Sequence, residues 1–218
     1  MAQEDYLMRM LRQFVAALQH IRTLRATRQE QAALDAIRQA AGHLLALPPD
    51  VALHLSLPEV LASRPALPVG PAPRETQIAL ATLLYEAGTL YTTQQRAAEA
   101  YPCYLQALSR LLEVGLQQPA PPFPPETPSI AALTTALASY RLPQETNARL
   151  LQYYEQVGAY AQAEDVLYAL LADAPDDPTL RALGRAFYQR LLRQPDACLI
   201  AGNLPRDEVQ EGLARLQD

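Results

Sequence analysis

The distribution of proline constrains this chain of 218 residues more than any other feature. Ten of its 19 prolines lie in two short stretches, residues 65–73 and 119–128. Proline removes a backbone donor and clashes with the preceding helical turn, so neither stretch can continue a helix. The rest of the chain is rich in Ala and Leu and has no Trp, a mixture that favours helix over strand. We therefore predict an all-α protein with an extended linker at 64–74. A stiff connector at 119–128 should separate N-terminal hairpins (1–118) from C-terminal hairpins and a cap (129–218), although its PxxP spacing could also bind an aromatic groove.

Apolar residues recur every three or four positions through the predicted helices, as expected for amphipathic helices. In the first helix, residues 3–26, this stripe comprises Tyr6, Leu7, Met10, Leu11, Phe14, Leu18 and Ile21. Further helices are predicted at 29–47, from Asp50 and Ser56 onward, and at 75–92, 96–116, 129–139, 144–157, 160–172, 177–193 and 206–217. Pro102 should kink the helix at 96–116 or mark its first turn.

Small and aromatic residues recur at the spacing of a helical repeat. The middle pair of helices contains Gly88, Tyr91, Ala100, Tyr104 and Ala107, and similar positions follow at 150–175 and from 180 onward. The second and third copies are offset by 33 residues. This spacing resembles the tetratricopeptide repeat, a helix hairpin of about 34 residues. The resemblance implies a right-handed array of antiparallel helix hairpins, interrupted here by the proline-rich stretches.

In tetratricopeptide proteins, the first helix of each hairpin lines a concave groove that holds a peptide. Carried over residue by residue, the resemblance places ten residues of this chain on such a groove. They are Tyr85, Thr89, Thr92, Gln152, Glu155, Gln156, Arg181, Arg185, Tyr188 and Gln189. A solvated helix face would explain the same residues. The basic clamp of relatives that bind acidic C-terminal tails has no counterpart, because Ala148 and Gln152 stand at the matching places.

Over nearly its full length the chain also resembles a bacterial family described only as a domain of unknown function. The resemblance is carried by residues 5–10 (DYLMRM), by 153–155 (YYE) with 158–160 (GAY), and by 202–206 (GNLPR). It implies no activity.

Several classes of chemistry lack the residues that they need. All 18 basic residues are Arg, so no lysine can form a Schiff base or serve a P-loop. Cys103 and Cys198 are isolated, and His20, His43 and His54 lack the spacing of metal ligands. The acidic pairs of neighbouring residues point in different directions on a helix, and the pair before Pro178 is typical of a helix cap. We therefore predict no enzymatic activity, no metal and no cofactor.

Net charge and hydropathy limit the partners. A net charge of −5 disfavours nucleic acid, which requires a basic face. The N-terminus is acidic and has no secretion signal, and no apolar run approaches a membrane span, so we expect a cytoplasmic protein that does not bind membranes. Our main hypothesis is a scaffold that holds an unidentified protein or peptide in a helical groove. The alternatives are a small-molecule sensor or enzyme with a pocket between the two halves, and a structural homodimer formed through the first helix.

Overall fold

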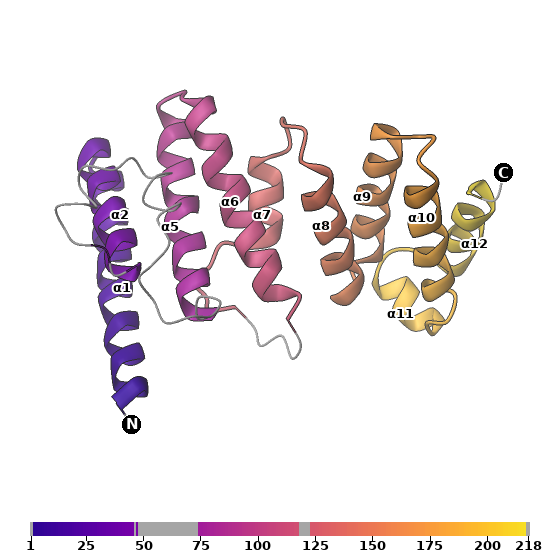
Figure 1. The fold of residues 1–218 in the computed structure, drawn as a ribbon, viewed down its shortest axis with the longest axis horizontal. Helices are drawn as coiled ribbons and strands as arrows, with labels where there is room; N and C mark the ends of the chain where they lie inside the picture. The colour runs from indigo at the N-terminus through magenta and orange to yellow at the C-terminus, as the bar shows by residue number, and fades with distance from the viewer. Residues whose placement is uncertain (1, 46, 48–73, 118–122, 217–218) are drawn as a thin grey trace. The chain divides into compact units, whose positions relative to one another are not determined.

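The computed structural model describes residues 2–45, 47, 74–117 and 123–216, and every regular element within them is a helix (Figure 1). The prediction of an all-α protein is therefore confirmed. The helices are α1 (Ala2–Ala26), α2 (Glu30–Leu44), α5 (Arg74–Thr93), α6 (Ala97–Gly115), α7 (Ile130–Ala136), α8 (Gln144–Gln156), α9 (Tyr160–Asp173), α10 (Pro178–Leu191), α11 (Asp196–Ala201) and α12 (Arg206–Arg215). The short helices predicted from Asp50 and Ser56, and nearly all of the linker predicted at 64–74, lie outside the described residues.

The chain divides into two compact units. The first comprises Met1–Val114 and Pro119–Tyr140, and the second comprises Gly115–Gln118 and Arg141–Asp218. This division differs from the predicted one, because α7 belongs to the first unit rather than to the C-terminal hairpins. The reason is local packing just after α7. The Tyr140 ring lies 4.8 Å from that of Tyr101 on α6, and its hydroxyl donates a hydrogen bond to the Ala97 carbonyl at 3.4 Å.

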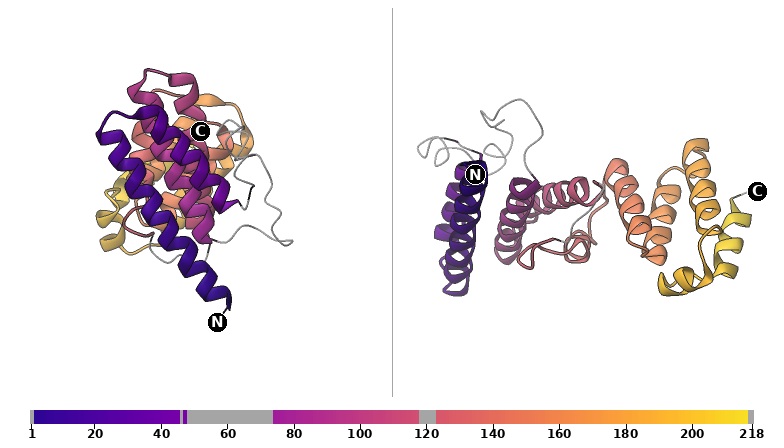
Figure 2. Two further views of the ribbon diagram at one scale, coloured as in Figure 1. Left: turned by 90° about the vertical axis from the view of Figure 1, so that its left-hand side faces the viewer. Right: turned by 90° about the horizontal axis from the view of Figure 1, so that it is seen from below.

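The first unit is built on α5, which is buried along most of its length. The α1–α2 hairpin lies beside α5 (Figures 1 and 2). Leu18 and Ile21, two residues of the predicted stripe on α1, are buried, as is Ile37 of α2. On α6, Pro102 lies about one turn after the helix begins and the helix continues to Gly115. Pro102 is the sixth residue of the helix, just past the first turn whose N–H groups have no intrahelical partner, so one intrahelical hydrogen bond is lost.

The second unit consists of the α8–α9 hairpin followed by α10, α11 and α12. Its core is formed mainly by Leu151, Tyr160, Ala163, Leu167, Leu170, Leu180, Phe187, Tyr188, Leu191, Leu199, Leu204 and Val209. The sequence pattern did not predict α11, a helix of 6 residues that begins after Pro195 and buries Leu199. The turn after α11 approaches the α8–α9 turn closely, since the Ala161 amide donates a hydrogen bond to the Gly202 carbonyl at 3.0 Å.

The three helix hairpins share one turn geometry. Each turn contains a residue with positive φ, which is Arg28 (58°), Gln95 (59°) or Gly158 (77°). In each, the amide of the following residue donates to a carbonyl five residues earlier, as Arg96 does to Tyr91 at 2.8 Å. This is the Schellman arrangement that ends helices while satisfying their last carbonyls. The turns are thus short, and they set consecutive helices antiparallel.

Candidate functional site

An open cleft lies in the second unit between α8 and α10, with a contribution from the first residue of α9. Its volume is about 460 Å³, and it is lined by Leu151, Gln152, Glu155, Gln156, Tyr160, Leu183, Arg190, Leu191 and Gln194. Leu151, Tyr160 and Leu191 are buried and form its apolar base, whereas Gln152, Gln156 and Gln194 are exposed. The cleft therefore combines apolar contact area with side-chain amides that can donate and accept hydrogen bonds.

An ion pair joins the two helices that border the cleft. Arg190 on α10 donates from Nε to Oε1 of Glu155 on α8 at 2.6 Å, and from Nη2 to Oε2 at 2.7 Å. This is the two-pronged geometry in which a guanidinium matches a carboxylate best. The hydrogen bonds to Glu155 raise the pKa of Arg190, so the arginine stays charged. Burial raises the pKa of Tyr160, whose phenol consequently remains protonated.

The groove residues predicted on α8 line this cleft. Gln152, Glu155 and Gln156 are all among its lining residues. Their spacing of three and four positions places them on the side of α8 that borders the cleft.

On α10, the cleft is lined by residues other than those predicted. The lining residues Leu183, Arg190 and Gln194 lie on roughly the opposite side of the helical path from the predicted Arg181, Arg185 and Gln189, at about 100° per residue. The predicted Tyr188 offers no surface to a partner, because it is fully buried. No local signal distinguished the cleft side of α10, because an arginine flanks its buried stripe on each side.

Arg181 and Arg185 each bind a backbone carbonyl. Arg181 Nε donates to the Pro175 carbonyl at 3.2 Å, just before α10 begins. Arg185 Nη1 donates to the Leu216 carbonyl at 3.1 Å, immediately after α12. These bonds hold the two chain segments against α10.

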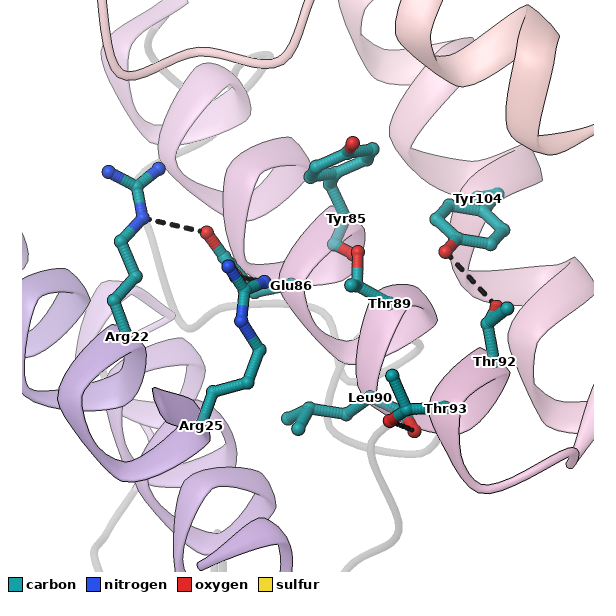
Figure 3. A network of polar contacts seen from close by, with 9 residues as sticks. All are labelled: Arg22, Arg25, Tyr85, Glu86, Thr89, Leu90, Thr92, Thr93 and Tyr104. Carbon is teal, nitrogen blue, oxygen red and sulfur yellow. Dashed lines mark hydrogen bonds and ion pairs between the residues drawn. The ribbon is translucent and has the colours of Figure 1, made fainter. Parts of the chain in front are cut away.

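The predicted groove residues of the first unit share one side of α5 (Figure 3). The Tyr85 ring packs against that of Tyr104 with centroids 5.8 Å apart. The Thr89 hydroxyl donates to the Tyr85 carbonyl at 2.9 Å. The Thr92 hydroxyl donates to the Gly88 carbonyl at 2.8 Å and lies 3.1 Å from the Tyr104 hydroxyl. The contacts of Tyr85 and Thr92 with Tyr104 join α5 to α6, whereas the hydroxyl bonds to the carbonyls lie within α5. Whether the same residues also bind a partner stays a prediction.

A buried carboxylate joins α1 to α5 beside these residues (Figure 3). The Glu86 side chain is only 3% exposed, and each of its oxygens accepts from an arginine of α1. Arg22 Nε donates to Oε1 at 2.8 Å, and Arg25 Nη1 donates to Oε2 at 2.5 Å. Both arginines keep part of their guanidinium in solvent, being 44% and 35% exposed. The carboxylate is thus compensated where it cannot be hydrated.

A second network of polar side chains lies among α9, α10 and α12. The buried Tyr188 hydroxyl donates to Oε1 of Glu164 at 2.7 Å, and Arg215 Nη1 donates to the Tyr168 hydroxyl at 3.3 Å. Burial is the main cause that raises the pKa of Glu164, and the bond from Tyr188 acts against it. Burial, together with the hydrogen bonds that its hydroxyl donates to Tyr168 and Glu164, also raises the pKa of Tyr188.

Among the described residues, no cysteine or histidine lines the cleft. Cys103 is buried in α6, and burial raises the pKa of its thiol to about 12. Cys198 is exposed on α11, and His20 and His43 are exposed on α1 and α2. His54 lies outside the described residues, within which no group of three His, Cys, Asp or Glu side chains could hold a metal ion.

A family model matches the whole chain, residues 1–218. The chain belongs to this family. It is a family of unknown function (DUF6483), so membership assigns no activity to the cleft. No curated protein and no solved structure matches this DUF6483 member. None of its helices, within the part of the chain that the structure describes, is long and apolar enough to cross a membrane.

Proposed function

We propose that this DUF6483 member is a non-enzymatic scaffold whose α8–α10 cleft binds a peptide segment of a partner protein. The observation that carries the proposal is the lining of the cleft, in which an apolar base is bordered by exposed amides and one ion pair. A peptide presents the matching groups, since its backbone donates and accepts hydrogen bonds and its side chains supply apolar area.

The size of the cleft supports a short segment rather than a whole domain. Its volume of about 460 Å³ lies in the range of roughly 300–1,000 Å³ that is usual for ligand sites. A helix or a domain would instead require an extended surface of many hundreds of Å². The cleft is also open, so a segment could enter and leave it without disturbing the core.

The arrangement of helix pairs supports the same function. Antiparallel pairs joined by short turns, as in the proposed tetratricopeptide-like array, present the surfaces of successive helices to a common ligand. In the second unit, the first helix of the α8–α9 hairpin and the following α10 border the cleft. The chemistry offered there is apolar contact and hydrogen bonding through Leu183 and the glutamines.

A displayed library of random peptides tests this proposal. The full chain, immobilised through a terminal tag, is used to select peptides, and the affinities of enriched peptides are measured by fluorescence anisotropy. We expect binding to fall at least tenfold in Gln152→Trp, because an exposed amide at the cleft is replaced by a bulky ring that occludes it. Leu183→Glu should weaken binding in the same way, by placing a charge against the apolar base.

Ala169→Glu on the exposed side of α9 is the matched control, and it should bind as the wild type does. Circular dichroism on each variant verifies that the helices are retained. Peptides that bind equally to the wild type and to Gln152→Trp would refute the cleft as the binding site. Failure to enrich any peptide would refute the function itself.

A further inference from the structure

The Glu155–Arg190 ion pair determines the net charge of the cleft. Of the nine lining residues, these two are the charged ones. Both carboxylate oxygens of Glu155 accept from Arg190, at 2.6 and 2.7 Å, so the two charges compensate each other closely. Glu155 is 20% exposed and Arg190 is 45% exposed, so both charges remain close enough to solvent to meet a ligand. The remaining lining residues are amides, leucines and a tyrosine.

A ligand side chain of either charge would meet a like charge in this cleft. An acidic ligand side chain that approaches Arg190 is repelled by the Glu155 carboxylate, which already accepts from Nε and Nη2. A basic side chain that approaches Glu155 meets the guanidinium in the same way. Like-charge contacts of this kind disfavour charged partners and so contribute to specificity.

We propose that the α8–α10 cleft selects an uncharged peptide segment, an inference that rests on the proposed peptide-binding function. Glu155 and Arg190 are then specificity-determining residues, because each masks the charge of the other. The glutamines border the path of the segment, and the amides of Gln152 and Gln194 can each pair with a backbone N–H and C=O. Leu183 and the buried base then favour an aliphatic side chain in the ligand.

The proposal requires that removing one charge should unmask the other. In Glu155→Gln, Arg190 loses its carboxylate and presents an uncompensated guanidinium, so the cleft should now accept Asp or Glu in the peptide. In Arg190→Gln, Glu155 becomes the unpaired charge, and the cleft should accept Lys or Arg. If the pair served stability alone, these variants would be less stable, but the peptides that they select would carry the same charge as those of the wild type.

The test is a parallel selection on the wild type, Glu155→Gln and Arg190→Gln, using one library of random displayed peptides. Enriched segments should be uncharged for the wild type, acidic for Glu155→Gln and basic for Arg190→Gln. Anisotropy on a matched set, one enriched peptide with its central residue as Gln, Glu or Lys, should show a change of about tenfold in relative affinity. The change should shrink as salt is raised, because the site is partly exposed.

Glu145→Gln is the control, since it makes the same charge change on α8 within an exposed ion pair to Arg149, away from the cleft. Its selected peptides should match those of the wild type. Enriched segments with the same charge on all four proteins would overturn the inference and leave the peptide-binding function intact. Absence of enrichment on every protein would instead overturn the proposed function, and this inference with it.

Discussion

The ring of Tyr104 lies directly against Gly88 where α5 and α6 cross. A Cβ atom added at Gly88 would come within 2.7 Å of the Tyr104 ring. The ring cannot easily move away, because Tyr85 packs on it and the Thr92 hydroxyl lies 3.1 Å from its own. The hairpin therefore requires glycine at position 88 for close approach.

Gly88→Ala should destabilise the protein. Alanine improves helix propensity by about 1 kcal/mol, but overpacking a buried site costs about 1–3 kcal/mol. We expect a net loss of up to about 2 kcal/mol, measured by urea unfolding. In a double-mutant cycle with Tyr104→Leu, the two costs should be less than additive, since the smaller side chain makes room.

Gly184→Ala is an informative comparison for this prediction. There the added Cβ would come within 2.6 Å of Leu216 Cδ1, the end of a flexible side chain close to the C-terminus. We expect a clearly smaller loss than at Gly88, because Leu216 can change rotamer. Equal losses at the two sites would show that the rigidity of the Tyr104 ring is not the cause.

The sequence predicted local features well. Helix bounds follow from apolar spacing and from proline and glycine, which are local signals, and most predicted bounds lie within three residues of those observed. Gly88 and Tyr104 were also identified as repeat positions from the spacing of small and aromatic residues, although their contact with each other was not predicted. Similarly, Gln152 and Glu155 were placed on the side of α8 that borders the cleft.

Features that depend on packing between distant segments were not predictable. The buried residues of helix α10 recur at spacings of three or four and form one stripe, with Arg190 on one flank and Arg181 on the other, so periodicity alone did not identify which flank borders the cleft. The ion pairs of Glu86 join residues more than 60 positions apart and leave no local pattern. The helix after Pro195 buries one large side chain, which is too weak a signal for a periodic pattern.

Removing the two arginines of the Glu86 network should lower the free energy of unfolding more than neutralising Glu86 itself. Replacing Arg22 and Arg25 together by Leu leaves a carboxylate buried without compensation, which costs about 3–5 kcal/mol. Glu86→Gln leaves two half-exposed guanidinium groups that water can hydrate, so we expect a loss of only about 1 kcal/mol. Chemical unfolding monitored by circular dichroism gives both values.

A triple variant shows whether the loss of stability comes from the uncompensated charge or from lost side-chain packing. If Glu86→Leu is added to the double arginine variant, most of the lost stability should return, because no buried charge remains. A triple variant as unstable as the double variant would contradict this account and would assign the loss to the arginine side-chain contacts.

The shared turn geometry predicts a gain of stability at Gln95. An L-residue in the left-handed region costs about 1–2 kcal/mol, whereas glycine adopts it freely and loses about 0.5–1 kcal/mol in chain entropy. Gln95→Gly should thus stabilise the protein by about 0.5–1 kcal/mol, raising the melting temperature by about 1–4 °C. Arg28→Gly should act in the same direction.

Gly158→Ala provides the reverse experiment at the third turn. Nothing lies within 4 Å of an added Cβ at this glycine, so steric contact plays no part and only the positive φ of 77° matters. We expect a loss of about 1 kcal/mol. A neutral result at Gly158 would mean that the turn changes conformation to accommodate the side chain, and the expected gain at Gln95 would then also disappear.

The environment of Glu164 predicts how one carboxyl group affects stability as a function of pH. Burial disfavours its charged form, so its pKa is raised in the folded protein. Between the ordinary glutamate pKa and the raised one, the folded chain keeps a proton that the unfolded chain has lost. Unfolding then releases a proton, so this group's contribution to the free energy of unfolding falls as pH rises through that interval.

Glu164→Gln should remove this contribution while keeping an oxygen that accepts the hydrogen bond from Tyr188. The stability of the variant relative to the wild type should therefore increase as pH rises from below the ordinary glutamate pKa, and then level off above the raised one. Urea unfolding at a series of pH values measures this difference. Asp165→Asn, an exposed neighbour on α9, removes the same charge and should not reproduce the profile. A flat difference for Glu164→Gln would mean that the hydrogen bond from Tyr188 offsets the burial of the carboxylate completely.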